Sequence, residues 1–293
     1  MTKAVLRRAR PLLGTLVDIT LDAPNEAFGL AAAEAAFAAI ERVHASMSFH
    51  MATSDVSRIN TAAVNTAIRV DPQCVEVLML ADDVHRRSNG LFDISVAPRL
   101  VDRGLLPRPA STVIPSTGLR DGLKIIERDT VLKRAPLWID LGGIAKGYAV
   151  DRAIDALRDN GVSNALVNAG GDMRAIGERA YPVNVRDPAN PYSIQPLVRL
   201  ENVALATSAR YFSTRTHRGK MVNALIHPRT GECDHSGVSV SVLAPTCAQA
   251  DALTKVVLIS GNTRHPALTA FQATALMLAP ASTPHTHDAP LSA

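Results

Sequence analysis

The sequence predicts an α+β fold in which helices pack against a mixed sheet. Short segments with alternating apolar and polar residues are separated, at irregular intervals, by longer segments with helical periodicity. An evenly wound βαβ protein would instead place a helix after nearly every strand. We expect a single domain over residues 1–278 and a flexible tail over 279–293, where Pro, Ala, Thr and His dominate.

The composition is that of a globular protein. Hydrophobic residues make up 47% and charged residues 20% of the 293 positions, with a net charge of +4, so disorder is not expected. The one dense basic run, Arg7–Arg10, is interpreted as a solvated chain end. Aromatic residues are only 4%, which leaves little material for stacking bases, and nucleic acid is therefore not the expected partner.

The cysteines and the apolar segments bear on cofactors and location. Cys74, Cys233 and Cys247 are far apart in the chain, so the sequence predicts neither a disulfide framework nor a zinc site. No apolar run has the length of a membrane span, and the N-terminus lacks an apolar signal core. We therefore expect a cytoplasmic protein, or a periplasmic one if a leader has been removed.

In the N-terminal third, the patterns alternate between strand and helix. Apolar residues recur at every second position within Gly14–Leu21, which predicts a strand. Ala23–Met47 has one apolar helical stripe and predicts a long helix. A short helix is expected near Ser54. Asp71–Asn89 predicts a second amphipathic helix with a proline in its first turn, and the following Gly90–Leu100 is interpreted as a loop.

The rest of the chain predicts strands interrupted by two helices. Val131–Leu141 has strand character and leads into a glycine pair, after which a helix runs to Asn160–Gly161. A Pro-Arg-Thr-Gly turn at Pro228–Gly231 is expected between strands, and Thr246–Ile259 predicts the last helix. Further short strands are expected at residues 164–172, 181–187, 203–209 and 237–245.

The stretch "WIDLGGIAKGYAVDRAIDALRDNG", residues 138–161, has the strongest chemical signal. Glycines allow a close approach of the backbone to a ligand, and a lysine at the start of a helix adds charge where anions are already favoured. These features predict a phosphate-binding loop. The stretch is neither G-x-G-x-x-G nor a P-loop, because Lys146 is followed by Gly147 and Tyr148.

Other polar positions are candidates for the same site, although each also has a purely structural explanation. Asp140 can bond its own loop, Gly142–Gly143 can form a plain turn, Lys146 can be solvated, and Asp251 can stabilise a helix N-terminus. The remaining candidate positions are Phe92–Asp93, Thr207–Ser208, His227–Gly231 and Cys247–Lys255.

A hard cation would need oxygen ligands. Asp251, Thr254 and the carbonyl groups around Gly143 are of the right type, but the sequence alone does not bring them together.

Seven motifs occur together in an order and spacing that resembles the ApbE-type flavin transferases, the FAD:protein FMN transferases. They are "MSFHMATSDVSRIN", "GLFDISVAPRL", "IDLGGIAKGYAVD", "NAGGDMRAIG", "ALATSARY", "HPRTG" and "VSVLAPTCAQADAL". The resemblance extends over Gly14–Gly261. It implies a T-fold-like α+β fold with a mixed or antiparallel sheet, and a cleft for FAD between two lobes. It also implies an enzyme that moves FMN from FAD to a Thr or Ser hydroxyl of a target flavoprotein and releases AMP.

The resemblance also implies roles for individual residues. Mg²⁺ would bind the pyrophosphate of FAD with Gly143, Asp251 and Thr254 as its ligands. The catalytic roles fall to Asp251, which we hypothesise accepts the proton of the incoming hydroxyl, and to Lys255. The residues expected to bind FAD are Leu13, His50, Leu91, Phe92, Asp93, Asp140, Lys146, Thr207, Ser208 and Leu225.

The chain departs from the family pattern within this site. Lys255 occupies the position of the usual hydroxyl ligand, so its ammonium either supplies part of the charge of the cation or repels Mg²⁺. His50 replaces an aromatic residue, Leu13 a methionine, and Ala209 a glycine. Two alternatives to the transferase therefore stay open, namely an FAD pyrophosphatase that yields FMN and AMP, and a non-catalytic FAD-binding protein.

Overall fold

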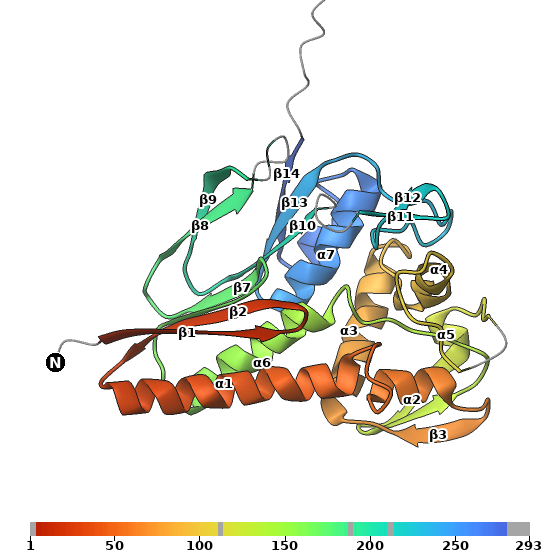
Figure 1. Cartoon of the computed structure of the whole chain (residues 1–293), viewed down its shortest axis with the longest axis horizontal. Coiled ribbons are helices and arrows are strands. Elements are labelled where there is room, and N and C mark those ends of the chain that lie inside the picture. Colours follow the sequence, from red (N-terminus) through yellow and green to blue (C-terminus); the bar gives the residue numbers. More distant parts are fainter. Residues whose placement is uncertain (1–3, 111–113, 187–189, 191, 210–213, 280–293) are drawn as a thin grey trace, which may run out of the picture.

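The computed structural model shows an antiparallel sheet with helices packed against it (Figure 1). It describes residues 4–110, 114–186, 190, 192–209 and 214–279. The predicted tail at 279–293 therefore lies outside the described residues, apart from Ala279. Within the described part of the chain, no helix has both the length and the apolar character needed to cross a membrane.

The main sheet has seven strands in the order β1-β2-β6-β7-β10-β13-β14. Every pairing within it is antiparallel, which confirms the α+β class and selects an antiparallel rather than a mixed sheet. Its strands are β1 (Ala4–Leu12), β2 (Thr15–Ala23), β6 (Ala165–Ala169), β7 (Asp172–Ile176), β10 (Ala204–Ala209), β13 (Ser239–Ala244) and β14 (Thr274–Leu278).

Smaller sheets surround the main one. A three-stranded sheet has the order β3-β5-β4, and two hairpins pair β8 with β9 and β11 with β12. The strands of these sheets are β3 (Thr66–Arg69), β4 (Leu123–Glu127), β5 (Thr130–Lys133), β8 (Tyr181–Arg186), β9 (Ile194–Leu200), β11 (Arg215–His217) and β12 (Lys220–Val222).

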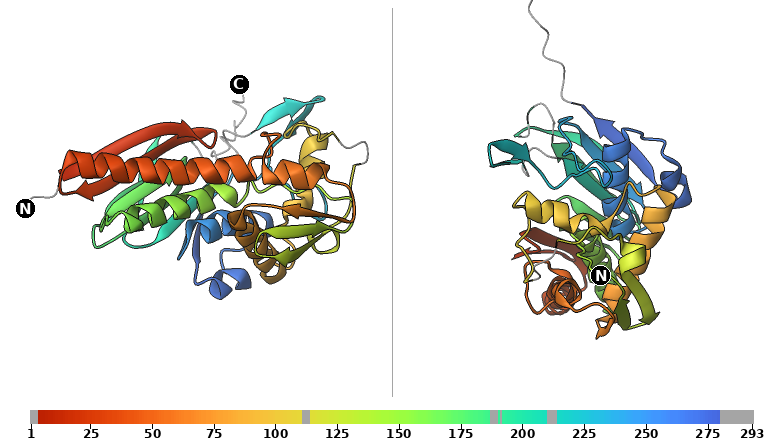
Figure 2. Two further views of the ribbon diagram at one scale, coloured as in Figure 1. Left: turned by 90° about the horizontal axis from the view of Figure 1, so that it is seen from below. Right: turned by 90° about the vertical axis from the view of Figure 1, so that its right-hand side faces the viewer.

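Three helices form the layer that supports the site. The long helix α1 packs along α6, α6 crosses α7, and α7 lies against β10 and β13 (Figures 1 and 2). The helices are α1 (Glu26–Met47), α2 (Asp55–Thr61), α3 (Pro72–Arg87), α4 (Ala97–Asp102), α5 (Leu119–Gly122), α6 (Ala145–Asp159), α7 (Cys247–Ser260) and α8 (Pro266–Ala270), with a short 3₁₀ turn η1 (Ile94–Val96).

The structure corrects the interpretation of the N-terminal basic run. Arg7–Arg10 lies within β1, at the edge of the main sheet, and so is a strand and not a chain end. Its arginine side chains are exposed, as expected. Arg7 lies 3.4 Å from Asp18 of β2, and Arg10 pairs with Glu34 of α1. The outward face of an edge strand tolerates charge, so the dense arginines obscured the strand pattern.

The predicted strand Val131–Leu141 is too long. Strand β5 ends at Lys133, three residues before Pro136, which has no N–H to donate to a ladder. The buried segment beyond it is held by a side chain. The amide of Asn60 accepts from Ile139 N at 2.8 Å and donates to Ile139 O at 2.9 Å. One asparagine thus supplies the donor and acceptor that a neighbouring strand would provide.

The predicted loop Gly90–Leu100 is partly helical, because it contains η1 and the start of α4. Asp93 caps η1, since its Oδ1 accepts from Ser95 N at 2.8 Å.

Candidate functional site

The glycine loop before α6 forms one wall of the site. Asp140 Oδ1 accepts a hydrogen bond from Gly142 N at 3.1 Å, which bends the loop back on itself. Gly143 faces two other elements: a Cβ added there would lie 3.3 Å from Phe92 Cε2 and 3.6 Å from Lys255 Cε. The loop therefore brings bare backbone against Phe92 and against the last turns of α7.

Gly147 allows α6 and α7 to cross closely. A Cβ at Gly147 would lie 2.3 Å from Cys247 O, a backbone atom that cannot move aside easily. At the same crossing, Gly147 N donates to Asp251 Oδ2 at 3.3 Å. The absence of a side chain at one position thus places the Asp251 carboxylate beside the first turn of α6.

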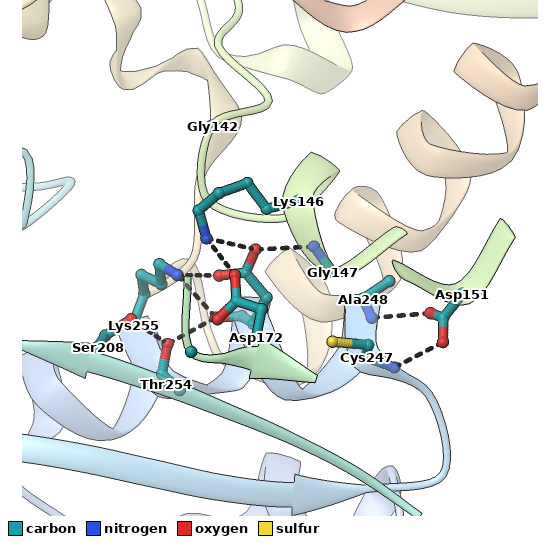
Figure 3. A network of polar contacts seen from close by, with 12 residues as sticks. Gly142, Lys146, Gly147, Asp151, Asp172, Ser208, Cys247, Ala248, Thr254 and Lys255 are labelled. Carbon is teal, nitrogen blue, oxygen red and sulfur yellow. Dashed lines mark hydrogen bonds and ion pairs between the residues drawn. The ribbon is translucent and has the colours of Figure 1, made fainter. Parts of the chain in front are cut away.

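Four charged residues, which we call the charge cluster, meet at this crossing (Figure 3). They are Lys146, Asp172, Asp251 and Lys255. Lys146 Nζ contacts Asp172 Oδ2 and lies 3.7 Å from Asp251 Oδ2. Lys255 Nζ contacts Asp251 Oδ1 and lies 3.0 Å from the backbone oxygen of Asp251. Two cations and two carboxylates therefore make the cluster neutral overall.

The members of the charge cluster differ in their access to solvent. The side chains of Asp172 and Asp251 are 2% and 0% exposed, whereas those of Lys146 and Lys255 are 37% and 18% exposed. Because the carboxylates lie beneath the ammonium groups, an incoming anion would meet positive charge first.

The pKa values in the charge cluster follow from burial and mutual charge. Burial, followed by the charge of Asp251, raises the pKa of Asp172 to about 6. Burial would also raise the pKa of Asp251, but Lys146 and Lys255 outweigh it and lower that pKa. Burial would lower the pKa of Lys146, yet Asp172 and Asp251 raise it above its usual value. At neutral pH Lys146 is thus a fixed cation and Asp251 a fixed anion.

Two cavities open on either side of the glycine loop, and both are lined by Asp140 and Gly142. The first, of about 190 Å³, is lined by Leu91, Phe92, Asp93, Gly143, Leu225 and Lys255, among others. The second, of about 450 Å³, has Leu13, His50 and Lys146 in its lining. The structure thus gathers most of the predicted FAD-binding residues around one loop, with one ammonium group on each side.

The two predicted hydroxyl residues of β10 face different ways. Ser208 Oγ lies 2.7 Å from Thr254 Oγ1 and so points to α7, beside the charge cluster (Figure 3). Thr207 Oγ1 lies 2.8 Å from Ser241 Oγ and lines a separate cavity of about 590 Å³ bordered by Gly170 and Gly171. Neighbouring residues of a strand point to opposite faces, so the structure does not bring Thr207 to the two cavities around the glycine loop.

Sequence reasoning missed the partner of Lys146. Asp172 follows the glycine pair in "NAGGD", and it begins β7 with its carboxylate buried against Lys146. The available signal was an acidic residue directly after two glycines, at a position where the chain enters a buried strand.

Asp151 was also missed, and it has a structural role. It lies in α6 and accepts hydrogen bonds from Cys247 N and Ala248 N, both at 2.9 Å, which are the first amides of α7. Arg174 balances its charge at 2.7 Å. Asp151 thus caps one helix of the site from another, and this link cannot be read from local sequence.

Two of the residues expected to bind Mg²⁺, Asp251 and Thr254, already have partners within the chain. Asp251 already contacts the ammonium of Lys255 through both its carboxylate and its backbone oxygen. The Thr254 hydroxyl donates to that same backbone oxygen at 2.6 Å. Among the residues that the structure describes, no group of three or more His, Cys, Asp or Glu side chains could hold a metal ion. Mg²⁺ needs oxygen ligands, and to use the Asp251 oxygens that Lys255 contacts it would have to displace the Lys255 ammonium.

Fold and site together define an antiparallel α+β protein in which a glycine loop separates two cavities, each lined by one lysine. The sequence profile described as the ApbE family matches residues 13–278. The chain therefore belongs to the ApbE family.

Individual relatives agree with this assignment. The protein from Vibrio cholerae named FAD:protein FMN transferase is 28% identical over 242 residues, which cover 77% of this chain and 72% of the relative. The solved structure of flavin transferase ApbE from Vibrio cholerae matches with a TM-score of 0.79 and 25% identity, covering 95% of this chain and 94% of that one. The ApbE protein from Thermotoga maritima matches with a TM-score of 0.78 and 26% identity, covering 94% of each chain.

Proposed function

We propose that this chain is an FAD:protein FMN transferase. Its relatives of that name support the reaction class, and the placement of Lys146 and Lys255 on the two cavities beside the glycine loop is the observation that carries the proposal. FAD spans the two cavities in this proposal, with its diphosphate over Asp140–Gly143, where backbone and ammonium groups can meet phosphate oxygens.

The proposed reaction is one phosphoryl-type transfer. A Thr or Ser hydroxyl oxygen of the target flavoprotein forms a bond to the phosphorus of the FMN half of FAD. The bond from that phosphorus to the bridging oxygen breaks, its electron pair stays on the bridging oxygen, and AMP leaves. The hydroxyl proton passes to a base or to solvent. Lys146 and Lys255 stabilise the negative charge that the phosphate oxygens carry during transfer.

The role of Asp251 in this proposal is to position Lys255. Its lowered pKa makes it a weak base, so the proton-accepting role expected from the sequence gains no support from the geometry. Asp251 instead holds the Lys255 ammonium at the wall of the first cavity.

Incubation with FAD, Mg²⁺ and a candidate target flavoprotein tests the proposed function. We expect FMN to become covalently attached to the target, AMP to be released, and a target with its acceptor Thr or Ser changed to Ala to stay unlabelled. Lys146→Met should lower the transfer rate roughly a hundredfold, as for other lost electrostatic contacts to a developing charge. Free FMN with AMP would indicate the pyrophosphatase, and unchanged bound FAD would indicate a binding protein. Either result would overturn the proposal.

A further inference from the structure

Lys255 carries a positive charge that its own helix, α7, holds within the site. It is one helical turn after Asp251 in α7, and the i,i+4 spacing brings its ammonium back onto the Asp251 carboxylate. Its side chain also lines the first cavity. The ammonium is therefore held from below by Asp251 and faces the space in which we place FAD.

The hydrogen-bonding capacity of Lys255 leaves room for a ligand. An ammonium group has three N–H donors. Two of them are directed at Asp251, to its Oδ1 and to its backbone oxygen. The third has no acceptor among the residues that the structure describes, and 18% of the side chain is exposed. Lys146 is similar, because it pairs with Asp172 and Asp251 while 37% of its side chain is exposed.

A divalent cation would have to displace this arrangement. To bind Asp251 Oδ1 or its backbone oxygen it would have to displace the ammonium of Lys255. The remaining oxygen, Oδ2, accepts from Gly147 N at 3.3 Å and lies 3.7 Å from Lys146 Nζ. The nearby hydroxyls are also engaged, since Thr254 donates to Asp251 O and lies 2.7 Å from Ser208 Oγ. Placing a divalent ion beside the ammonium groups of Lys255 and Lys146 would add like-charge repulsion.

We propose that Lys255 replaces a divalent metal ion in this chain, so that FAD is bound and FMN is transferred without Mg²⁺. The inference rests on the proposed function, because it assigns the FAD diphosphate to the site beside the charge cluster. Lys255 and Lys146 place two ammonium groups beside the two phosphate groups, above the buried carboxylates that hold them, and neither ammonium is a dissociable ion.

The first test is FAD binding by the whole protein, measured by flavin fluorescence in the presence of EDTA and again with Mg²⁺. We expect the dissociation constants to agree within about twofold. Lys255→Thr should weaken FAD binding in EDTA by roughly tenfold to a hundredfold, which is the usual cost of losing a hydrogen bond to a charged group. Lys255→Arg keeps the charge and should retain metal-independent binding.

The second test is direct metal binding, measured with Mn²⁺ by electron paramagnetic resonance in the presence of FAD. We expect no protein-bound Mn²⁺ in the wild type and bound Mn²⁺ in Lys255→Thr, where Asp251 becomes free to act as a ligand. Mn²⁺ binding by the wild type that disappears in Asp251→Asn would overturn the inference.

Failure of the inference differs from failure of the proposed function. FAD binding that requires Mg²⁺, followed by normal FMN transfer, would overturn the metal-free proposal and leave the transferase intact. Absence of FAD binding under both conditions would overturn the proposed function, and the inference would fall with it.

Discussion

The three cysteines illustrate how the environment of a single residue controls its chemistry. Burial, followed by the nearby charge of Asp55, raises the pKa of the Cys74 thiol to about 12. Burial also raises the pKa of Cys247 well above its ordinary value, and Asp151 adds to the effect. Cys233 is the partly exposed member of the three.

We therefore expect one thiol to react in the native protein. At neutral pH the reactive thiolate of Cys74 is suppressed about tenfold for each unit that its pKa exceeds the pH, and both Cys74 and Cys247 are out of contact with solvent. Titration with a chromogenic disulfide reagent should detect Cys233 alone before denaturation and all three afterwards. Loss of the signal in Cys233→Ser is the control, and rapid native labelling of Cys74 would contradict the burial argument.

At the scale of elements, the site depends on how closely α6 and α7 cross. Gly147 supplies the space for the crossing, and Asp151 of α6 binds the first amides of α7. The charge cluster takes Lys146 from α6 and both Asp251 and Lys255 from α7, so its geometry follows the distance between these two helices.

Gly147→Ala should therefore destabilise the fold and disturb the site together. The added methyl group would lie 2.3 Å from Cys247 O, so the helices must separate, at a cost of about 1–3 kcal/mol for an overpacked position. Urea unfolding measures the decrease in the free energy of unfolding. Gly118→Ala is the matched control, because a Cβ there meets nothing within 4 Å, and it should change stability by less than about 0.5 kcal/mol. Equal stability of the two variants would show that the crossing tolerates a wider spacing.

At the scale of the whole molecule, the site lies over the middle of the main sheet. Asp172 begins β7 and Ser208 lies in β10, two neighbouring strands near the centre of the order, whereas β1 and β14 are the edges. A central strand has a neighbour on each side, so the amides on both of its edges are hydrogen-bonded and protected from exchange. The charge cluster thus lies against the strands of the sheet that are least prone to local unfolding.

Hydrogen exchange should be slow in the central strands of the main sheet and faster at its edges. We expect amides of β6, β7 and β10 to exchange most slowly, and the outward-facing amides of β1 to exchange much faster, since β1 pairs with β2 alone. Mass spectrometry of peptides from the deuterated protein measures the exchange of each strand. Protection of β1 equal to that of β6 would mean that the N-terminal edge is covered in solution, contrary to the strand order.

The long helices could be predicted from the sequence because their signals are local. Helices were predicted at Ala23–Met47, Asp71–Asn89 and Thr246–Ile259, the first two from apolar periodicity, and all three lie close to the observed α1, α3 and α7. Asn25 and Thr246 cap their helices by accepting from amides three residues ahead, an interaction contained within a few residues. The family motifs likewise selected residues most of which line the two cavities beside the glycine loop, and their binding of FAD stays a prediction.

The sequence by itself thus determined the class of fold, the principal helices and the family to which the chain belongs. Tertiary structure alone decided which charges meet. Lys146 contacts Asp172, which lies 26 positions away in the sequence. Other contacts of the site and its support are equally distant in sequence: Gly147 N donates to Asp251 across 104 positions, and Asn60 bonds Ile139 across 79 positions. Local patterns report the conformation of a few neighbouring residues, whereas a buried charge is stabilised by whichever partner the folded chain brings to it.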